Sequence, residues 1–167
     1  MTWDAYHRRN EVLRDVAATA DRRRDGVLPW DELEAARAAF DSPTDLLLAL
    51  HMRWNTRLRA HAEAELDAQP ADLGSAASRA WRNASADLPG TRAILDAQQN
   101  NPALAEARKK ELAFLASVAG LAAPGDLTAA VHGQRIVADG RAITLDRQRP
   151  AGHRGGLVHR VRQALVA

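Results

Sequence analysis

The sequence predicts a mainly α-helical fold: an irregular bundle of about five to six helices, followed by a small β-hairpin and a terminal amphipathic helix. Three observations lead to this prediction. Apolar residues recur at helical spacing through roughly the first 120 residues. Proline follows serine once and asparagine once in a pattern typical of helix starts. The pattern changes after Pro124-Gly125, where the chain carries its best hairpin signal.

Length and composition limit the class of protein. The chain has 167 residues and no cysteine, and one domain with a short appendage is the natural count. The lack of cysteine excludes disulfides, thiolate metal sites and cysteine nucleophiles, and it fits a reducing compartment. The N-terminus shows no signal-peptide pattern, and no apolar run approaches the ~20 residues of a membrane-spanning helix. We therefore expect a cytoplasmic protein with no membrane partner.

The first two helices are expected over residues 3–20 and 29–40, separated by a break at Asp25-Gly26. Thr2 is the expected N-cap of the first helix. The apolar face of this helix consists of Tyr6, Leu13, Val16 and Ala20. Helical spacing of these residues indicates that this face packs on the core.

The third helix is expected to be the longest, from Pro43 to about residue 68. Ser42 is its expected cap, proline occupies the first helical position, and Asp45 adds a negative charge to the first turn. One side of the helix carries Leu47, Leu50, Trp54, Leu58, Ala62 and then Glu65 or Leu66. This stripe is expected to face the core.

Three more helices are expected over residues 70–88, 91–98 and 103–119. Pro89-Gly90 is expected to end the first of them, and Gly120 to cap the last. The stripe on the helix over 70–88 is Leu73, Ala77, Trp81, Ala84 and Leu88. The stripe on the helix over 103–119 is Leu104, Arg108, Leu112, Leu115 and Val118.

Residues 125–167 are expected to form an appendage that packs on, or extends from, a helical core over residues 1–124. A short helix is expected over 126–132. Extended stretches over 134–138 and 141–145 flank Asp139-Gly140, a dipeptide typical of two-residue hairpin turns. A lone hairpin is only marginally stable, so it must pack on the helices or on a partner. An amphipathic helix is expected over 157–166.

Charge is unevenly distributed along the chain. Residues 133–167 carry seven arginines and two aspartates, a net charge of +5, whereas the preceding 132 residues have a net charge of −3. A basic end on a mildly acidic body is suited to docking on an anionic surface. Arginine binds phosphate bidentately, and a glycine-rich loop before a helix allows close backbone approach. The predicted anion-binding residues are Arg135, Arg141, Arg147, Arg149, Arg154, Gly155, Gly156, Arg160 and Arg162.

The leading functional hypothesis is a non-enzymatic interaction module whose basic end contacts nucleic acid or a ribonucleoprotein. No aromatic residue follows Phe114, so the contacts would go to phosphate and carry little sequence information. Three alternatives for this segment are a solvated tail, arginines paired with the acidic body, and a winged-helix arrangement. Self-association through the amphipathic terminal helix is also left open.

Residues 21–32 resemble an EF-hand calcium loop. Asp21, Asp25, Gly26 and Glu32 occupy positions 1, 5, 6 and 12 of that pattern. Arg23 stands at position 3, where the pattern needs an oxygen ligand, and arginines on either side oppose cation binding. We therefore favour a simple turn between two helices, and we expect no metal and no cofactor.

A second functional hypothesis is a helical small-molecule or metal-binding protein with a pocket between tryptophan-bearing helices. The tryptophans are Trp3, Trp30, Trp54 and Trp81, each on the expected apolar face of a separate helix. Core packing is the simpler interpretation for them, and also for a histidine near such a face.

A third hypothesis is an enzyme that uses His61 and Glu65, one helical turn apart. Neither a nucleophile elbow nor a metalloprotease or dinucleotide-binding motif accompanies this pair. We therefore favour a function other than catalysis.

Two segments resemble a family of mainly helical actinobacterial proteins with no assigned function. They are residues 46–66, LLLALHMRWNTRLRAHAEAEL, and residues 81–96, WRNASADLPGTRAILD. The resemblance covers roughly the first 120 residues and rests on pattern and composition rather than on a catalytic motif. It implies a mainly helical fold and transfers no functional residue.

Overall fold

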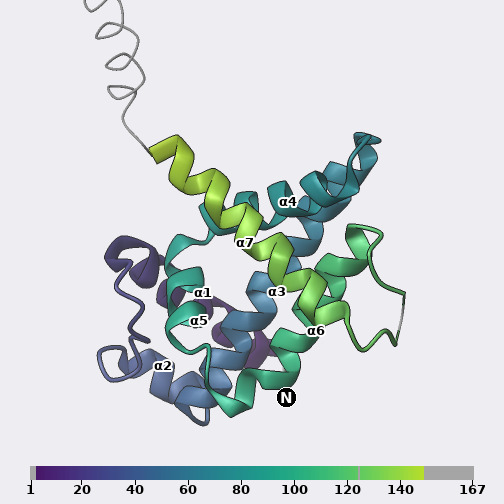
Figure 1. Ribbon diagram of the computed structural model, residues 1–167. Helices are drawn as coiled ribbons and strands as arrows, with labels where there is room; N and C mark the ends of the chain where they lie inside the picture. Colours follow the sequence, from purple (N-terminus) through teal and green to yellow (C-terminus); the bar gives the residue numbers. More distant parts are fainter. Residues whose placement is uncertain (1–2, 124, 149–167) are drawn as a thin grey trace, which may run out of the picture.

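The computed structural model describes residues 3–123 and 125–148. Within these ranges it contains seven α-helices, one 3₁₀ helix over Pro102–Leu104 and no β-strand (Figure 1). The helices are α1 (Trp3–Arg23), α2 (Glu34–Ala39), α3 (Pro43–Asp67), α4 (Leu73–Asp87), α5 (Pro89–Ala97), α6 (Ala105–Val118) and α7 (Ala129–Gln148). The predicted mainly α-helical class is confirmed. None of these helices combines the length and apolar character that crossing a membrane requires.

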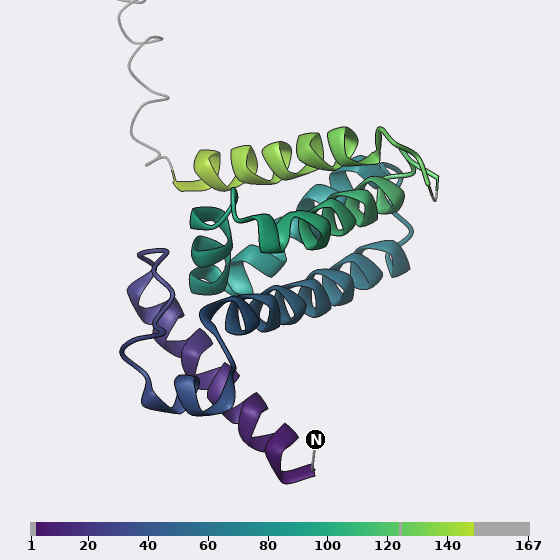
Figure 2. The same ribbon diagram turned by 90° about the horizontal axis from the view of Figure 1, so that it is seen from below.

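The helices are stacked in tiers. Figure 2 shows α7 on one side, α4 and α6 next to it, and α3 on the far side of that pair, while α1 and α2 cross one end of the stack. Helix α3 contacts α1, α4, α5 and α6, and α7 contacts α4 and α6. The described part of the segment after residue 124 therefore packs on the bundle and adds Ile136 to its core.

Helix α3 supplies much of the core, as its sequence predicts. The Oγ atom of Ser42 accepts the N–H of Asp45 at 3.1 Å, and Pro43 occupies the first helical position. The buried stripe is Leu46, Leu47, Leu50, His51, Trp54, Leu58 and Ala62. Each large apolar side chain of this stripe contributes roughly 1.5–3 kcal/mol when it is removed from water.

The tryptophans divide into buried and exposed residues. Trp54 and Trp81 are buried and pack edge to face, with ring centroids 6.1 Å apart. Trp30 is partly buried against the core, whereas Trp3 is 74% exposed. The core interpretation is confirmed for Trp54 and Trp81 and is wrong for Trp3, because this end of α1 extends beyond the helices that would cover it.

The predicted hairpin is replaced by helix: residues 134–145 belong to α7. Two glycines one heptad apart let α7 lie directly on its neighbours. A Cβ atom at Gly133 would overlap the carbonyl oxygen of Leu112, and a Cβ at Gly140 would lie 2.8 Å from Cε3 of Trp81. Close packing on α4 and α6 therefore overrides the turn preference of Asp139-Gly140. The predicted terminal helix over 157–166 lies outside the described residues.

Candidate functional site

The arginines predicted to bind an anion lie only partly within the structure. Arg135, Arg141 and Arg147 belong to α7, and Arg135 is exposed, with no side-chain partner within the described ranges. Arg141 instead donates to Oδ1 of Asp96 at 2.7 Å, and its guanidinium lies 5.6 Å from the Trp81 ring centroid. Arg141 is thus paired with the acidic body, one of the alternatives that the sequence leaves open. The remaining predicted residues, Arg149, Arg154, Gly155, Gly156, Arg160 and Arg162, lie outside the described residues.

The acids of the EF-hand-like loop do not converge. Asp21 accepts the N–H of Gly90 at 2.7 Å, at the N-terminus of α5, where an acceptor satisfies an otherwise free helix donor. Arg23 pairs with both Asp25 and Glu32, each at 2.6 Å. The loop is therefore a turn held by Arg23. Within residues 3–123 and 125–148, no group of three or more histidines and acids is arranged to hold a metal ion.

His61 and Glu65 contact other residues rather than each other. The Nε2 atom of His61 lies 2.8 Å from Oδ2 of Asp87, and Glu65 accepts from Nε of Arg79 at 2.8 Å. Both contacts join α3 to α4. The predicted acid–base pair is therefore not formed, and these side chains act as links between two helices.

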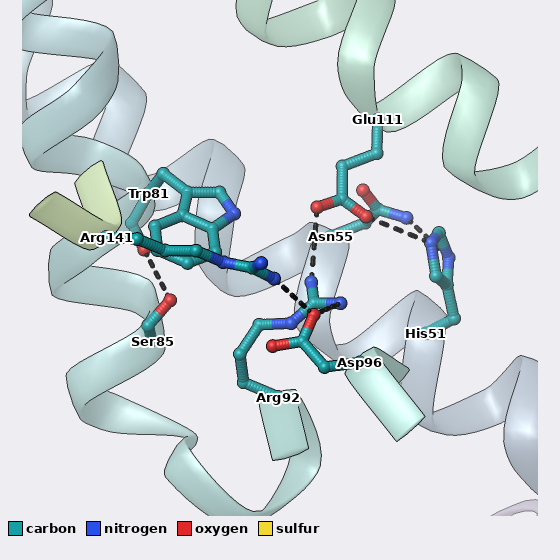
Figure 3. Close-up of polar contacts among 8 residues, drawn as sticks. All are labelled: His51, Asn55, Trp81, Ser85, Arg92, Asp96, Glu111 and Arg141. Carbon is teal, nitrogen blue, oxygen red and sulfur yellow. Dashed lines mark hydrogen bonds and ion pairs between the residues drawn. The ribbon is translucent and has the colours of Figure 1, made fainter. Parts of the chain in front are cut away.

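A buried polar cluster lies where α3, α5 and α6 meet, and Figure 3 shows Glu111 of α6 at its centre. The Nε2 atom of His51 lies 3.2 Å from Oε2 of Glu111, and Nδ1 of His51 lies 2.8 Å from Nδ2 of Asn55. Since a carboxylate only accepts and an amide nitrogen only donates, Nε2 carries the imidazole proton and Nδ1 accepts. His51 is thus a satisfied core residue, as the sequence predicts for a histidine beside an apolar stripe.

Arg92 of α5 holds the other side of Glu111. It is 8% exposed, and its Nη1 donates to Oε1 of Glu111 at 3.3 Å. Burial raises the pKa of Glu111, but the hydrogen bond from His51 and the charge of Arg92 outweigh it, so this pKa lies below its ordinary value. The guanidinium of Arg92 also lies 4.7 Å from the centroid of the Trp54 ring. Glu111 is therefore held as a buried carboxylate.

The cluster continues to the surface through Asp96. Its Oδ1 accepts from Nη2 of Arg141 at 2.7 Å and forms an ion pair with Nη2 of Arg92 at 2.9 Å. Arg92 thus bridges two carboxylates, and Arg141 connects α7 to α5 (Figure 3). The chain of contacts joins α3, α5, α6 and α7 and fixes the positions of these side chains before any ligand binds.

A cavity of about 490 Å³ lies beside this cluster, between α4, α5, α6 and α7; we call it the α4–α7 cavity. Its polar lining consists of Arg92, Asp96, Gln99, Arg108, Glu111, Gln134 and Arg141. The rest of its lining is Trp81, Leu112, Val137, Ala138 and Ala142. The pocket hypothesis requires a site between tryptophan-bearing helices, and the cavity meets this in part: Trp81 lines it, whereas Trp54 lies behind Arg92 and does not.

Three hydrogen-bond donors of the lining residues have no acceptor within the described part of the protein. They are Nε1 of Trp81, Nε of Arg92 and Nη1 of Arg108, all buried. The two carboxylates of the lining are occupied, Asp96 by two arginines and Glu111 by Arg92 and His51. Arg108 is therefore the lining cation for which the described residues offer no carboxylate.

A second hollow, of about 560 Å³, lies between α1 and α3 and is lined by Tyr6, Leu13, Met52, Arg53 and Arg57 among others. Tyr6 and Met52 are exposed there, at 50% and 68%. Among the described residues, no buried ionic cluster lines this groove. Arg9 of this lining is held by Asp45 at 2.7 Å, but none of the described carboxylates lines the groove, so it lacks the buried, oppositely charged pairs of the α4–α7 cavity.

Sequence analysis missed Glu111 and Arg92, because their partners are distant along the chain. One signal was present: Arg108 interrupts the apolar stripe of α6, where Leu104 and Leu115 are fully buried. A cation on a core-facing stripe indicates a polar feature under that helix. Comparison of the chain with family models, curated proteins and solved structures finds no match, so the resemblance to an actinobacterial helical family stays a prediction.

Proposed function

We propose that this protein is a non-enzymatic binding protein that holds a small organic molecule in the α4–α7 cavity. The observation that carries the proposal is the cavity itself, whose volume of about 490 Å³ is within the range of about 300–1,000 Å³ typical of ligand sites. Its lining combines an aromatic face, aliphatic groups and a few fixed polar groups. This composition is typical of sites that bind organic molecules.

The polar groups of the cavity are fixed in advance, which favours binding. Arg92 is held by Glu111, Asp96 and the face of Trp54, and Arg141 by Asp96. A ligand therefore meets an Arg92 side chain whose rotamer freedom is already lost, which makes the entropy cost of binding smaller. The hypothesis of an enzyme that uses His61 and Glu65 gains no such support, since both side chains are bound elsewhere.

Filling the cavity is expected to abolish binding. Ala138 is exposed and lines the cavity, so Ala138→Phe occupies the space without removing a polar contact. We expect calorimetric titration to detect binding of at least one of 2-naphthol, 2-naphthoate and 2-naphthylmethylamine to the wild type. Ala138→Phe should weaken that binding at least tenfold, about 1.4 kcal/mol.

The matched control is Ala60→Phe, which fills the groove between α1 and α3 from an exposed alanine instead. It should leave the affinity unchanged. Both variants should keep the wild-type melting temperature. The proposal is wrong if no probe binds, or if filling the groove weakens binding and filling the cavity does not.

A second candidate function is retained for the basic end of the chain: contact with nucleic acid or a ribonucleoprotein through phosphate. The net charge of +5 over residues 133–167 favours it, as does the exposed Arg135 with no side-chain partner among the described residues. Phosphate contacts release counterions, so affinity must fall steeply with salt.

Filter binding of single- and double-stranded RNA and DNA, from low to moderate salt, tests this second candidate. We expect salt-dependent retention by the wild type and its loss when Arg149, Arg154, Arg160 and Arg162 are all replaced by glutamine. Each phosphate contact removed should lower the slope of log K against log salt by about 0.7–0.9. Retention that is insensitive to salt, or unchanged in the variant, would exclude this function.

A further inference from the structure

We infer that the ligand of the α4–α7 cavity is a small organic acid, whose carboxylate or phosphate oxygens bind Arg108 while its apolar body lies against Trp81 and Val137. This inference rests on the proposed function and names the class of its ligand. It is carried by three features of the cavity: its charge balance, its unpaired donors and its apolar lining.

The charge balance of the described lining leaves one cation without a carboxylate. Three arginines and two acids line the cavity, and both acids are engaged, Asp96 by Arg92 and Arg141 and Glu111 by Arg92 and His51. Arg108, half-buried on α6, has no ion pair and no side-chain hydrogen bond within the described residues. An arginine in this position offers two parallel donors that match the geometry of a carboxylate or phosphate.

The unpaired donors indicate the same ligand chemistry. The Nε1 atom of Trp81 and the Nε atom of Arg92 are buried and lack acceptors among the described residues, and the two residues are 4% and 8% exposed. A buried donor without a partner costs roughly 1–3 kcal/mol, and an incoming acceptor removes that cost. These nitrogens are buried, so an acceptor reaches them only when the lining side chains move; a molecule rich in acceptor oxygens would then satisfy them, whereas an amine would add further donors and a positive charge.

The apolar part of the lining determines the rest of the ligand. Leu112, Val137, Ala138 and Ala142 contribute aliphatic groups, and Trp81 adds an aromatic surface. An inorganic anion would leave this surface uncovered. The volume of about 490 Å³ also exceeds what a bare anion fills. An acid with a flat or branched apolar body therefore fits better than phosphate or sulfate alone.

The first arm of the experiment compares probes of one shape and different charge. We expect calorimetry to show that 2-naphthoate binds the wild type at least tenfold more tightly than 2-naphthamide, its neutral analogue. Comparison with 2-naphthyl phosphate decides between the carboxylate and the phosphate head. In ¹H–¹⁵N spectra, the acid should shift the indole N–H resonance of Trp81, because this donor gains an acceptor.

The second arm substitutes the arginine. Arg108→Gln should weaken 2-naphthoate binding roughly tenfold to a hundredfold, as expected for a hydrogen bond to a charged group, and change 2-naphthamide binding little. Arg108→Lys keeps the charge and should restore part of the affinity. Lys109→Gln, which removes the same charge from the exposed neighbouring position, should have no effect. Since Arg108 has no side-chain partner among the described residues, the fold should tolerate its replacement.

The outcomes separate the two proposals. If 2-naphthamide binds the cavity as tightly as 2-naphthoate, or if Arg108→Gln leaves naphthoate binding unchanged, the inference of an acid ligand is wrong while the binding function stands. Water then serves the unpaired donors. If neither probe binds and Ala138→Phe changes nothing, the proposed function itself fails.

Discussion

Replacing Gly133 by alanine is expected to lower the free energy of unfolding by about 3 kcal/mol, the upper end of the range for overpacked substitutions. The new Cβ would overlap the carbonyl oxygen of Leu112 and lie 2.6 Å from its carbonyl carbon. Backbone atoms cannot rotate away as a side chain can, so α7 must move off α6 and expose Ile136. For a chain of this length the melting temperature should fall by roughly 6–12 °C in a circular dichroism melt.

The same substitution at Gly74 is the matched control. Gly74 lies in α4, and a Cβ there would approach only the side-chain Oδ1 of Asp72, at 3.3 Å. Alanine is favoured over glycine in a helix by roughly 0.5–1 kcal/mol, and this gain opposes a small shift of the Asp72 cap, so Gly74→Ala should change the free energy of unfolding by less than about 1 kcal/mol. A large loss of stability at Gly133 beside a small change at Gly74 would show that α7 is packed on α6. A Gly133→Ala variant that melts at the wild-type temperature would contradict this packing.

The helices that could be predicted from sequence are those whose signals are local. The cap of Ser42, the proline after it and the apolar stripe through Trp54 define α3, and the structure reproduces them. Helix α7 could not be predicted in this way. Asp139-Gly140 is a strong local turn signal, and the reason it is overridden is the surface of α4 and α6, which a local pattern does not contain.

The candidate site could be predicted only in outline. The sequence predicts, as one hypothesis, a pocket between tryptophan-bearing helices, and it places Arg108 on an apolar stripe without indicating a role for it. The buried polar cluster of Glu111, Arg92 and Asp96 joins residues that are far apart in the sequence. His51 and Glu111 are 60 positions apart, Arg141 and Asp96 are 45 apart, and Arg92 and Glu111 are 19 apart. Such pairs follow from the packing of helices and leave no periodic signal in the sequence.

Replacing Glu111 by glutamine is expected to destabilise the protein by about 3 kcal/mol at neutral pH, the lower end of the range of about 3–5 kcal/mol for breaking a buried ion pair. Glutamine keeps the shape of the side chain but removes its charge. Arg92 then stays buried with Asp96 as its one remaining carboxylate among the described residues. That remaining partner is the reason for expecting the lower end of the range.

The destabilisation caused by Glu111→Gln should become smaller at acidic pH, because only the ionised form of Glu111 provides the stabilisation that the substitution removes. The pKa of Glu111 in the folded protein lies below its ordinary value, since the hydrogen bond from His51 and the charge of Arg92 outweigh the opposing effect of burial. A group whose pKa is lowered by folding stabilises fully above its ordinary pKa, about 4.3, and its contribution is lost as the pH falls through the folded pKa. The difference between wild type and Glu111→Gln should therefore be constant near neutral pH and decrease below about pH 4.3.

Urea unfolding of both proteins between neutral pH and pH 3 measures this difference directly. Other carboxylates whose pKa is lowered, such as Asp45 beside Arg9, act equally in the two proteins and cancel in the comparison. Glu63→Gln is the control, because it makes the same substitution at an exposed position of α3. Its free energy of unfolding should stay within about 0.5 kcal/mol of the wild-type value at every pH. If the Glu111→Gln difference stayed constant down to pH 3, the carboxylate would not be the charged centre of the buried cluster.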